Sequence, residues 1–230
     1  MSIRPEDRKL DTILPESKPY LGKYPLSAYP PTGPMPGVIG VNWYTNFDRP
    51  VHDGIRWWVG RGDLGTIRGG HCVCIYTPKL ADLREWHAFY DQGSEGACVG
   101  FGVSRMMTLM NRKRYDAFWT YHTAQTLDPW AGEAYSGTSV DAGLQVLHTR
   151  GNRRIMDGVV DPAEGISAYR WTSSVDEILR TIGSPLATSL GAVPILNSWG
   201  VSFPHKTWFP GETMQRLLDE RGDCAFVVDR

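Results

Sequence analysis

The sequence predicts an α+β fold, in which helices in the middle of the chain are flanked on both sides by strands. Apolar residues recur at helical spacing within residues 80–155, and short runs rich in Val, Ile and Trp precede and follow that segment. The chain also has 25 glycines and 16 prolines among its 230 residues, which indicates many turns and argues against a helical bundle. A chain of this length forms one large domain or two small lobes.

The first segment, residues 1–36, is dominated by proline and holds eight of the 16 prolines. Each proline fixes φ and removes a backbone donor, so the segment is predicted to be an extended arm rather than a packed element. A disordered tail is the alternative. Five side chains would anchor the arm along a surface: Tyr20, Leu21, Tyr24, Leu26 and Tyr29.

Residues 37–79 are predicted to form the first part of a strand-rich lobe. Strands are expected over residues 38–45, 55–62 and 69–76, where β-branched and aromatic residues cluster between glycine-containing turns. The third strand is entered through two glycines and is then apolar apart from His71, which is typical of a buried strand.

Residues 80–155 are predicted to form a helical lobe. The basic residues 112–114 suit the C-terminal end of its first helix, because the helix dipole favours positive charge there. A second helix is expected over residues 139–150, with Gly151 suited to end it. The apolar face of the first helix is defined by Val99, Val103, Met106 and Met110.

Residues 156–230 are predicted to supply the remainder of the strand-rich lobe. Ser174 and Glu177 form the pattern of a capping box at the start of a helix, and Gly183 suits its end. A strand over residues 192–196, a helix over 213–220 and a closing strand over 224–228 are expected to follow.

Composition and charge exclude several classes of protein. Lys and Arg number 24 and Asp and Glu number 25, so no general attraction to nucleic acid or to an anionic membrane is expected. No apolar stretch approaches the roughly 18 residues of a membrane-spanning helix. The first residues lack the apolar core of a secretory signal peptide, so a cytoplasmic or other reducing compartment is expected.

Three of the four cysteines are predicted to be buried core thiols. Cys72 and Cys74 lie two residues apart in an apolar run, so they share one face of a strand, and Cys224 lies in the closing strand. No second pair of Cys or His residues has the spacing of metal ligands, so neither a metal nor a cofactor is expected.

Cys98 is the cysteine that is placed to act as a nucleophile. It lies at the start of a predicted helix after a glycine-rich loop, where the helix dipole and free N–H groups stabilise a thiolate or a developing oxyanion. Gln92, six residues upstream, offers a second donor for that oxyanion. A nucleophile of this kind needs an imidazole to take its proton and a group to orient the imidazole.

At these residues the chain resembles papain-like cysteine peptidases of the C1 family. The family signature of Asp-Gln-Gly, three residues and Cys is matched by residues 91–98, and Asn-Ser-Trp-Gly by residues 197–200. Residues 70–73, Gly-His-Cys-Val, resemble the short family strand that begins with His-Ala-Val. The likeness spans most of residues 37–202.

The resemblance implies a role for each matched residue. Cys98 would be the nucleophile, His71 the general base and acid, and Asn197 the residue that orients the imidazole. Trp199 would shield that hydrogen bond, and Gln92 would help to form the oxyanion hole.

The chain departs from the family at two single positions. Glu95 stands where the family usually has a disulfide cysteine, and Val99 stands where the family has an aromatic residue directly after the nucleophile. The missing cysteine agrees with a reducing compartment and is compatible with a bacterial or phage source.

The larger departure from the family is the chain order. The family runs Cys, His, Asn, whereas here His71 precedes Cys98 by 27 residues. In one account a transposed segment still brings the triad together, because triads are defined by geometry rather than order. In the other, His71 is a core histidine and the base lies elsewhere. We favour His71, because the remaining candidates lack its Gly-Gly-His strand context: His122, His148 and His205.

The resemblance implies a papain-like two-lobe fold with transposed segment order. Residues 80–155 would form the helical lobe, and residues 37–79 with 156–230 a strand-rich, barrel-like lobe. A peptide or protein substrate would lie in the cleft between them. The implied activity is that of a cysteine endopeptidase. The alternatives are a thiol amidase or transpeptidase acting on cell-wall or isopeptide bonds, and a catalytically silent papain-like binding module. The oligomeric state is left open.

Overall fold

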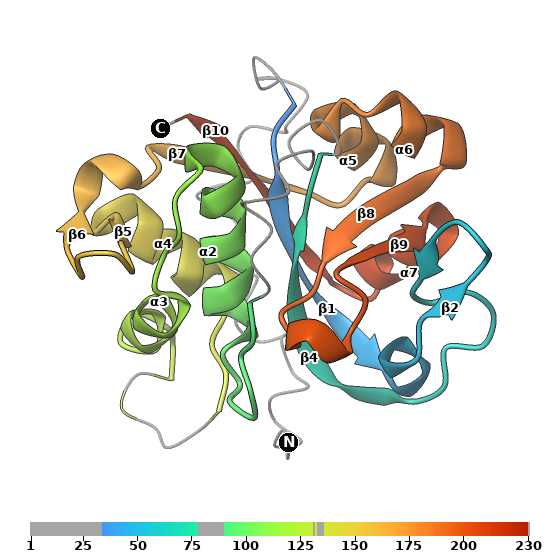
Figure 1. The fold of residues 1–230 in the computed structure, drawn as a ribbon, viewed down its shortest axis with the longest axis horizontal. Coiled ribbons are helices and arrows are strands. Elements are labelled where there is room, and N and C mark those ends of the chain that lie inside the picture. The colour runs from blue at the N-terminus through green and yellow to red at the C-terminus, as the bar shows by residue number, and fades with distance from the viewer. Residues whose placement is uncertain (1–33, 78–89, 131, 133–135, 230) are drawn as a thin grey trace.

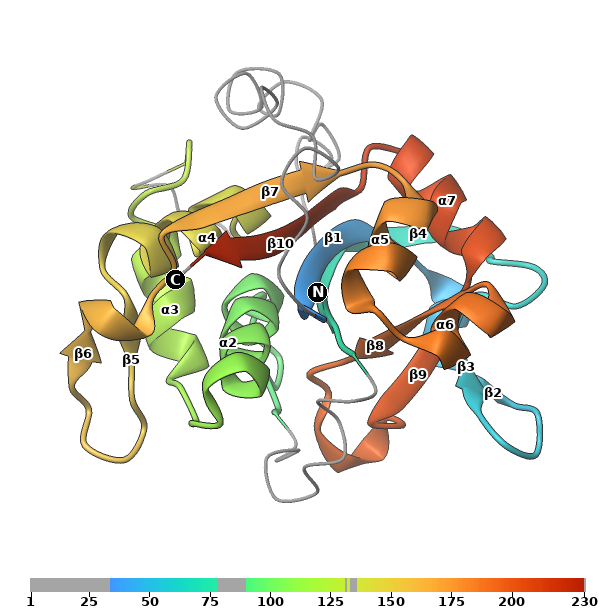
Figure 2. The same cartoon turned by 90° about the horizontal axis from the view of Figure 1, so that it is seen from above.

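The computed structural model describes residues 34–77, 90–130, 132 and 136–229, and within them the predicted α+β class is confirmed. A central sheet of eight strands runs through the molecule, with helices on both sides of it (Figures 1 and 2). Nearly all of the proline-rich arm predicted at residues 1–36 lies outside the described residues.

The sheet is mixed, with the strand order β2-β3-β9-β8-β4-β1-β10-β7. Only β3 and β9 are parallel neighbours, and every other neighbouring pair is antiparallel. Its strands are β1 (Gly37–Tyr44), β2 (Val51–His52), β3 (Trp57–Trp58), β4 (Ile67–Ile75), β7 (Ala168–Thr172), β8 (Ala192–Leu196), β9 (Lys206–Pro210) and β10 (Asp223–Asp229). A separate hairpin is formed by β5 (Asn152–Arg153) and β6 (Val160–Asp161).

Two expectations about the strands need correction. Among the described strands the sheet does not close into the expected barrel, because β2 and β7 remain as its two edges. The strand expected over residues 55–62 is also wrong in extent, since only Trp57–Trp58 pairs with neighbouring strands. Gly60 and Gly62 take φ values of 75° and 79°, so the chain turns away from the sheet there. This edge of the sheet is therefore formed by the two-residue strands β2 and β3.

Six α-helices lie among the described residues, and they divide between the two faces of the sheet (Figures 1 and 2). Helices α2 (Cys98–Asn111), α3 (Ala117–Ala124) and α4 (Val140–Thr149) lie on one side, with α3 packed against the other two. Helices α5 (Val175–Ile182), α6 (Pro185–Leu190) and α7 (Gly211–Asp219) lie on the other side. None of the helices in the described part of the chain is long and apolar enough to cross a bilayer.

Each face of the sheet buries its own hydrophobic core. Alternate residues of the central strands point to opposite faces, as the two-residue period of a strand requires. Cys72 and Cys74 of β4 face helix α2, in agreement with their spacing. Ile39 and Val41 of β1, with Val73 of β4, face the helices on the other side.

Helix boundaries follow the capping signals in the sequence. The Oγ atoms of Ser139 and Ser174 accept hydrogen bonds from first-turn N–H groups of α4 and α5, at 3.1 and 3.4 Å. The capping box at Ser174 is half formed, because the Glu177 carboxylate accepts a hydrogen bond from Thr172 instead. Gly183 ends α5 with φ at 56°, a left-handed conformation that suits glycine.

Sequence reasoning did not find β7, β9 or α6, whereas α3 (Ala117–Ala124) lies within the segment that was predicted to be helical. Helix α6 has six residues, which is less than two helical turns, and strand β9 has only five, Lys206–Pro210. Pairing with β8 and packing of α6 beside that strand define these elements instead.

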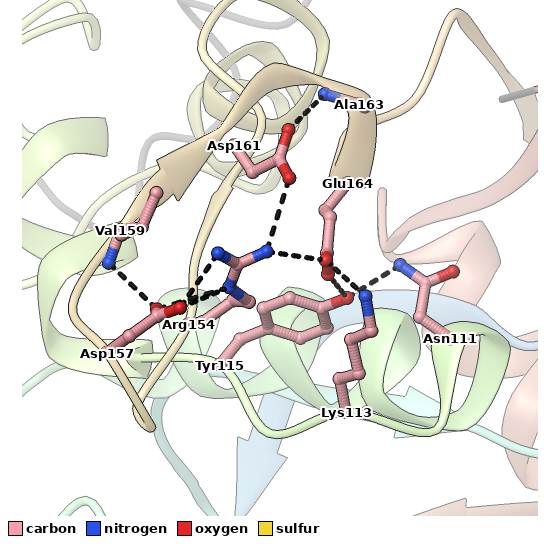
Figure 3. A network of polar contacts seen from close by, with 9 residues as sticks. All are labelled: Asn111, Lys113, Tyr115, Arg154, Asp157, Val159, Asp161, Ala163 and Glu164. Carbon is pink, nitrogen blue, oxygen red and sulfur yellow. Dashed lines mark hydrogen bonds and ion pairs between the residues drawn. The ribbon is translucent and has the colours of Figure 1, made fainter.

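A polar network ties the end of α2 to the β5–β6 hairpin (Figure 3). Glu164 is only 6% exposed, and its carboxylate accepts hydrogen bonds from Lys113, Tyr115 and Arg154. Arg154 also pairs with Asp157, at 2.8 Å. Burial alone would raise the pKa of Glu164. The hydrogen bonds from its three donors outweigh that effect, so the pKa lies below its ordinary value. Glu164 is therefore a fixed negative charge between two elements that are distant in sequence.

Candidate active site

The structure brings the four predicted site residues to one place. His71, Gln92 and Cys98 line a cavity of about 390 Å³, and Asn197 is hydrogen-bonded to His71. The cavity lies where the N-terminus of α2 meets strand β4 and the segment after β8. The remaining wall is formed by Trp43, Arg68, Gly69, Gly70, Gly93, Ser94 and Trp199.

The His71 imidazole is oriented by Asn197, which directly follows β8. Nε2 of His71 and Oδ1 of Asn197 are 2.8 Å apart. The main-chain N–H of Ser198 donates to the same Oδ1 at 2.7 Å, so the atom facing the imidazole is an acceptor. Nε2 therefore carries the proton of the neutral ring, and Nδ1 is left as its basic nitrogen.

Cys98 is the first residue of α2, and two glycines allow that helix to approach its neighbours closely. A Cβ atom at Gly102 would lie 2.8 Å from Sγ of Cys72 on strand β4. A Cβ atom at Gly100 would lie 2.4 Å from the main-chain oxygen of Ala117 in α3. Because Gly102 has no side chain, the N-terminal half of α2 can pack directly against β4, the strand that carries His71. The Cys98 thiol, at the start of α2, is thereby held beside that strand.

Burial favours the uncharged forms of both reactive groups. It raises the pKa of the Cys98 thiol, and main-chain hydrogen bonds from Cys72, Val99 and Cys98 itself partly oppose that effect. Burial also lowers the pKa of His71 to about 4, although the hydrogen bond to Asn197 works in the other direction. At neutral pH the resting site therefore holds a thiol and a neutral imidazole. No hydrogen bond joins these two groups within the described structure.

Two tryptophans enclose the imidazole. The ring of Trp43, on β1, is 4.6 Å from the His71 ring between centroids, in an edge-on arrangement. The ring of Trp199 is 4.9 Å from it and tilted by 35°. The place expected for Trp199, beside the bond between His71 and Asn197, agrees with this geometry.

The loop before α2 is fastened to the segment after β8. The main-chain N–H of Gln92 donates to the oxygen of Ser198 at 3.0 Å, and the N–H of Gly200 donates to the oxygen of Tyr90 at 3.1 Å. The Gln92 side chain donates from Nε2 to the oxygen of Glu95 at 2.9 Å, which leaves its second N–H available. These bonds hold the segments that carry Cys98 and Asn197 together.

The other candidate bases lie away from the cavity. His122 is on α3 with a side chain that is 60% exposed, 4.0 Å from a Glu95 carboxylate oxygen. Nδ1 of His148 lies 3.2 Å from the main-chain oxygen of Ile166. Neither of these residues nor His205 is part of the cavity wall.

The other three cysteines have the predicted place in the structure. Cys72, Cys74 and Cys224 are free and buried, and this confirms them as core thiols. Burial is also the main reason why the pKa of each thiol is raised. Across the described parts of the chain, no group of three His, Cys, Asp or Glu residues is arranged to hold a metal ion.

Sequence reasoning missed three side chains of the cavity wall, Trp43, Arg68 and Ser94. The alternation of the first strand places Trp43 on the face that carries Ile39 and Val41, and this signal could have identified it as a wall residue. No comparable signal marks Arg68, which depends on how β4 pairs with β1.

Comparison with protein-family models, with curated proteins and with solved structures found no match to this chain.

Proposed function

We propose that this chain is a cysteine peptidase that hydrolyses peptide bonds through Cys98, His71 and Asn197. The observation that carries the proposal is the 2.8 Å hydrogen bond that Asn197 makes to an imidazole sharing a cavity with Cys98. A thiol at a helix N-terminus beside an oriented imidazole is the arrangement that thiol-dependent acyl transfer requires.

In the acylation step Sγ of Cys98 attacks the carbonyl carbon of the substrate while Nδ1 of His71 takes the thiol proton. The carbonyl π electrons move to oxygen, where the main-chain N–H of Cys98 and the second N–H on Gln92 Nε2 stabilise the charge. The tetrahedral intermediate then re-forms its C=O bond and breaks its C–N bond. The imidazolium gives its proton to the departing amine, which leaves a thioester on Cys98.

In the deacylation step water replaces the amine. Nδ1 of His71 takes a proton from the water molecule as its oxygen attacks the thioester carbonyl. Collapse of the second intermediate breaks the C–S bond, releases a carboxylic acid and returns the proton to the Cys98 thiol. The lowered pKa of His71 keeps the ring neutral at pH 7, in the form that can accept each proton.

We further propose that the architecture is papain-like, with its segments in transposed order. A thiol on a helix and an imidazole on a strand of the sheet, which line one cavity, support this assignment. Residues 80–155 then correspond to the helical lobe, and residues 37–79 with 156–230 to the strand-rich lobe. The peptide or protein substrate lies in the cleft between them.

The direct test is hydrolysis of a fluorogenic peptide library by the full chain and by Cys98→Ala. We expect the variant to fold normally by circular dichroism and to lose turnover. Cys224→Ala removes a buried thiol that does not line the cavity and serves as the matched control, with turnover retained. Undiminished hydrolysis by Cys98→Ala would overturn the proposal.

The same acyl chemistry would serve an amidase or transpeptidase acting on cell-wall or isopeptide bonds. A screen that offers cell-wall fragments and branched isopeptides beside linear peptides separates these activities. Turnover of linear peptides with water as the acyl acceptor supports the peptidase. Turnover confined to the other substrates would reassign the site.

A catalytically silent binding module is the candidate from a different class. It is favoured by the raised pKa of Cys98 and by the missing hydrogen bond between this thiol and His71 in the described structure. Alkylation with iodoacetamide at pH 7 discriminates between the two. Reaction at Cys98 well ahead of the buried Cys224 supports the peptidase, and equal rates support the silent module.

A further inference from the structure

Arg68 alone carries a full charge at neutral pH among the described residues that line the cavity. It lies on β4, three residues before His71, and its side chain is 49% exposed. Within the described part of the chain, no aspartate or glutamate lines the same wall. Among the described lining residues, a ligand in the cavity therefore meets one cationic side chain and no carboxylate.

The Arg68 guanidinium is held in place by an ion pair with Asp48 and by its position over the Trp199 ring. Its Nη1 donates to the Asp48 carboxylate, which also accepts a hydrogen bond from Trp43 Nε1 at 2.9 Å. The guanidinium carbon lies 5.9 Å from the centroid of the Trp199 ring. Arg68 lines the cavity wall and Asp48 does not, so the positive member of the ion pair is the one at the wall.

One edge of the guanidinium remains available. The bond to Asp48 uses Nη1, while Nε and Nη2 make no hydrogen bond to any described residue. These two nitrogens form the edge that binds a carboxylate through two parallel N–H···O bonds. A lysine at this position would offer only a point charge.

We propose that Arg68 selects substrates that carry a carboxylate close to the bond attacked by Cys98. This inference rests on the proposed peptidase function and names its substrate class. The carboxylate belongs either to an Asp or Glu side chain or to the C-terminus of the peptide, and both present the same two oxygens to Nε and Nη2. A basic side chain at that place meets a like charge instead.

The test measures kcat/KM for four matched peptides, with Glu or Gln beside the cleaved bond and with a free or amidated C-terminus. We expect the full chain to prefer the matching carboxylate by about 10-fold or more, and Arg68→Gln to bring that ratio close to 1. The Glu and Gln arm reports a side-chain carboxylate, and the free and amidated arm reports a C-terminal one.

Arg61 provides a matched control. It also pairs with an aspartate, Asp53 at 3.7 Å, and it also lies over a tryptophan, Trp58 at 3.9 Å, but it does not line the cavity. Arg61→Gln should keep the preference of the full chain. Loss of preference in both variants, or equal ratios in the full chain and Arg68→Gln, would overturn the inference.

A binding experiment separates failure of this inference from failure of the proposed function. Fluorescein-labelled versions of the four peptides are titrated against Cys98→Ala with and without Arg68→Gln, and anisotropy reports binding without turnover. Carboxylate binding that depends on Arg68, without hydrolysis by the full chain, would remove the peptidase and keep the recognition site. Hydrolysis of all four peptides at equal rates would keep the peptidase and remove the selectivity.

Discussion

The imidazole of His71 and the carboxamide of Asn197 are joined at 2.8 Å across 126 residues of chain. The contact depends on the pairing of β4 with β8, in which Cys74 is opposite Leu196. His71 lies on the first of these strands and Asn197 directly follows the second. The sheet itself therefore orients the imidazole, and rigid elements hold functional groups more closely than loops do.

Replacing Asn197 by Ala should reduce peptide hydrolysis without unfolding the chain. The substitution leaves the Nε2–H of a buried imidazole unpaired, which costs about 1–3 kcal/mol. If the activation free energy rises by that amount, kcat/KM falls by roughly 10- to 100-fold, because about 1.4 kcal/mol corresponds to a factor of ten in rate. Steady-state kinetics measures the change. Asn46→Ala, which removes an exposed hydrogen bond to Asp63, is the control and should be neutral.

The stability of the chain should fall as the pH is lowered from about 6.5 to 4, through protonation of His71. Its pKa is lowered to about 4 in the folded state, against about 6.5 when exposed, so the unfolded state binds the proton first. The contribution of neutral His71 to the free energy of unfolding is complete above pH 6.5 and lost below pH 4. It amounts to about 3 kcal/mol. Urea unfolding at intervals of pH measures it. His71→Gln should flatten the curve in this window, and an unchanged slope would contradict the assignment.

Glu164→Gln should destabilise the chain by about 1–3 kcal/mol, because it removes the charge that satisfies Lys113, Tyr115 and Arg154 (Figure 3). Asp157 accepts from Arg154 in the same network but is 45% exposed, so Asp157→Asn should cost less than about 1 kcal/mol. Thermal and urea unfolding of both variants tests the ranking. A larger effect at Asp157 would show that the buried carboxylate is not the centre of the network.

Gly100→Ala should destabilise the packing of α2 on α3 by about 1–3 kcal/mol, since its Cβ would lie 2.4 Å from the main-chain oxygen of Ala117. Gly70 is the contrasting position, because a Cβ there meets nothing within 4 Å. Gly70→Ala should change stability by less than about 0.5 kcal/mol and report only on access to the cavity, through a raised KM. Equal unfolding curves for the two variants would contradict the close approach of α2 and α3.

Alkylation of Cys98 should accelerate steadily as the pH rises toward and beyond 9. Burial raises the pKa of this thiol, so the thiolate fraction at pH 7 is lower than for an exposed cysteine and grows with pH. Iodoacetamide labelling followed by mass spectrometry gives the profile. A rate that is already on a plateau between pH 5 and 8 would indicate a thiolate–imidazolium pair in the resting site instead.

The local signals in the sequence predicted the parts of the site that local structure determines. Cys98 was expected at a helix start and Asn197 after a buried strand, and both lie there. Arg68 was missed because its place on the cavity wall depends on how β1 and β4 pair, whereas the alternation of β1 does carry a signal for Trp43. The pairing is irregular between Trp43 and Tyr44, opposite Arg68, and such an irregularity cannot be inferred from apolar alternation.

The same distinction applies to the fold. Long periodic helices such as α2 and capped helices such as α5 were predicted near their observed ends. The expected barrel was not found among the described strands, because its closure would depend on pairing between the sheet edges β2 and β7. Such pairing is non-local, and no sequence window contains both strands.

The order of the strands along the chain also determines at which stage of synthesis the candidate site can assemble. β4 and α2 emerge early, whereas β8 and β10, which flank the β4–β1 pair, are made only with residues 192–196 and 223–229. A nascent chain that already carries Cys98 and His71 still lacks the residue that orients the imidazole. Pairing across such long separations is slow to form. Under the proposed function, hydrolysis is therefore delayed until β8 has joined the sheet and Asn197 has reached His71.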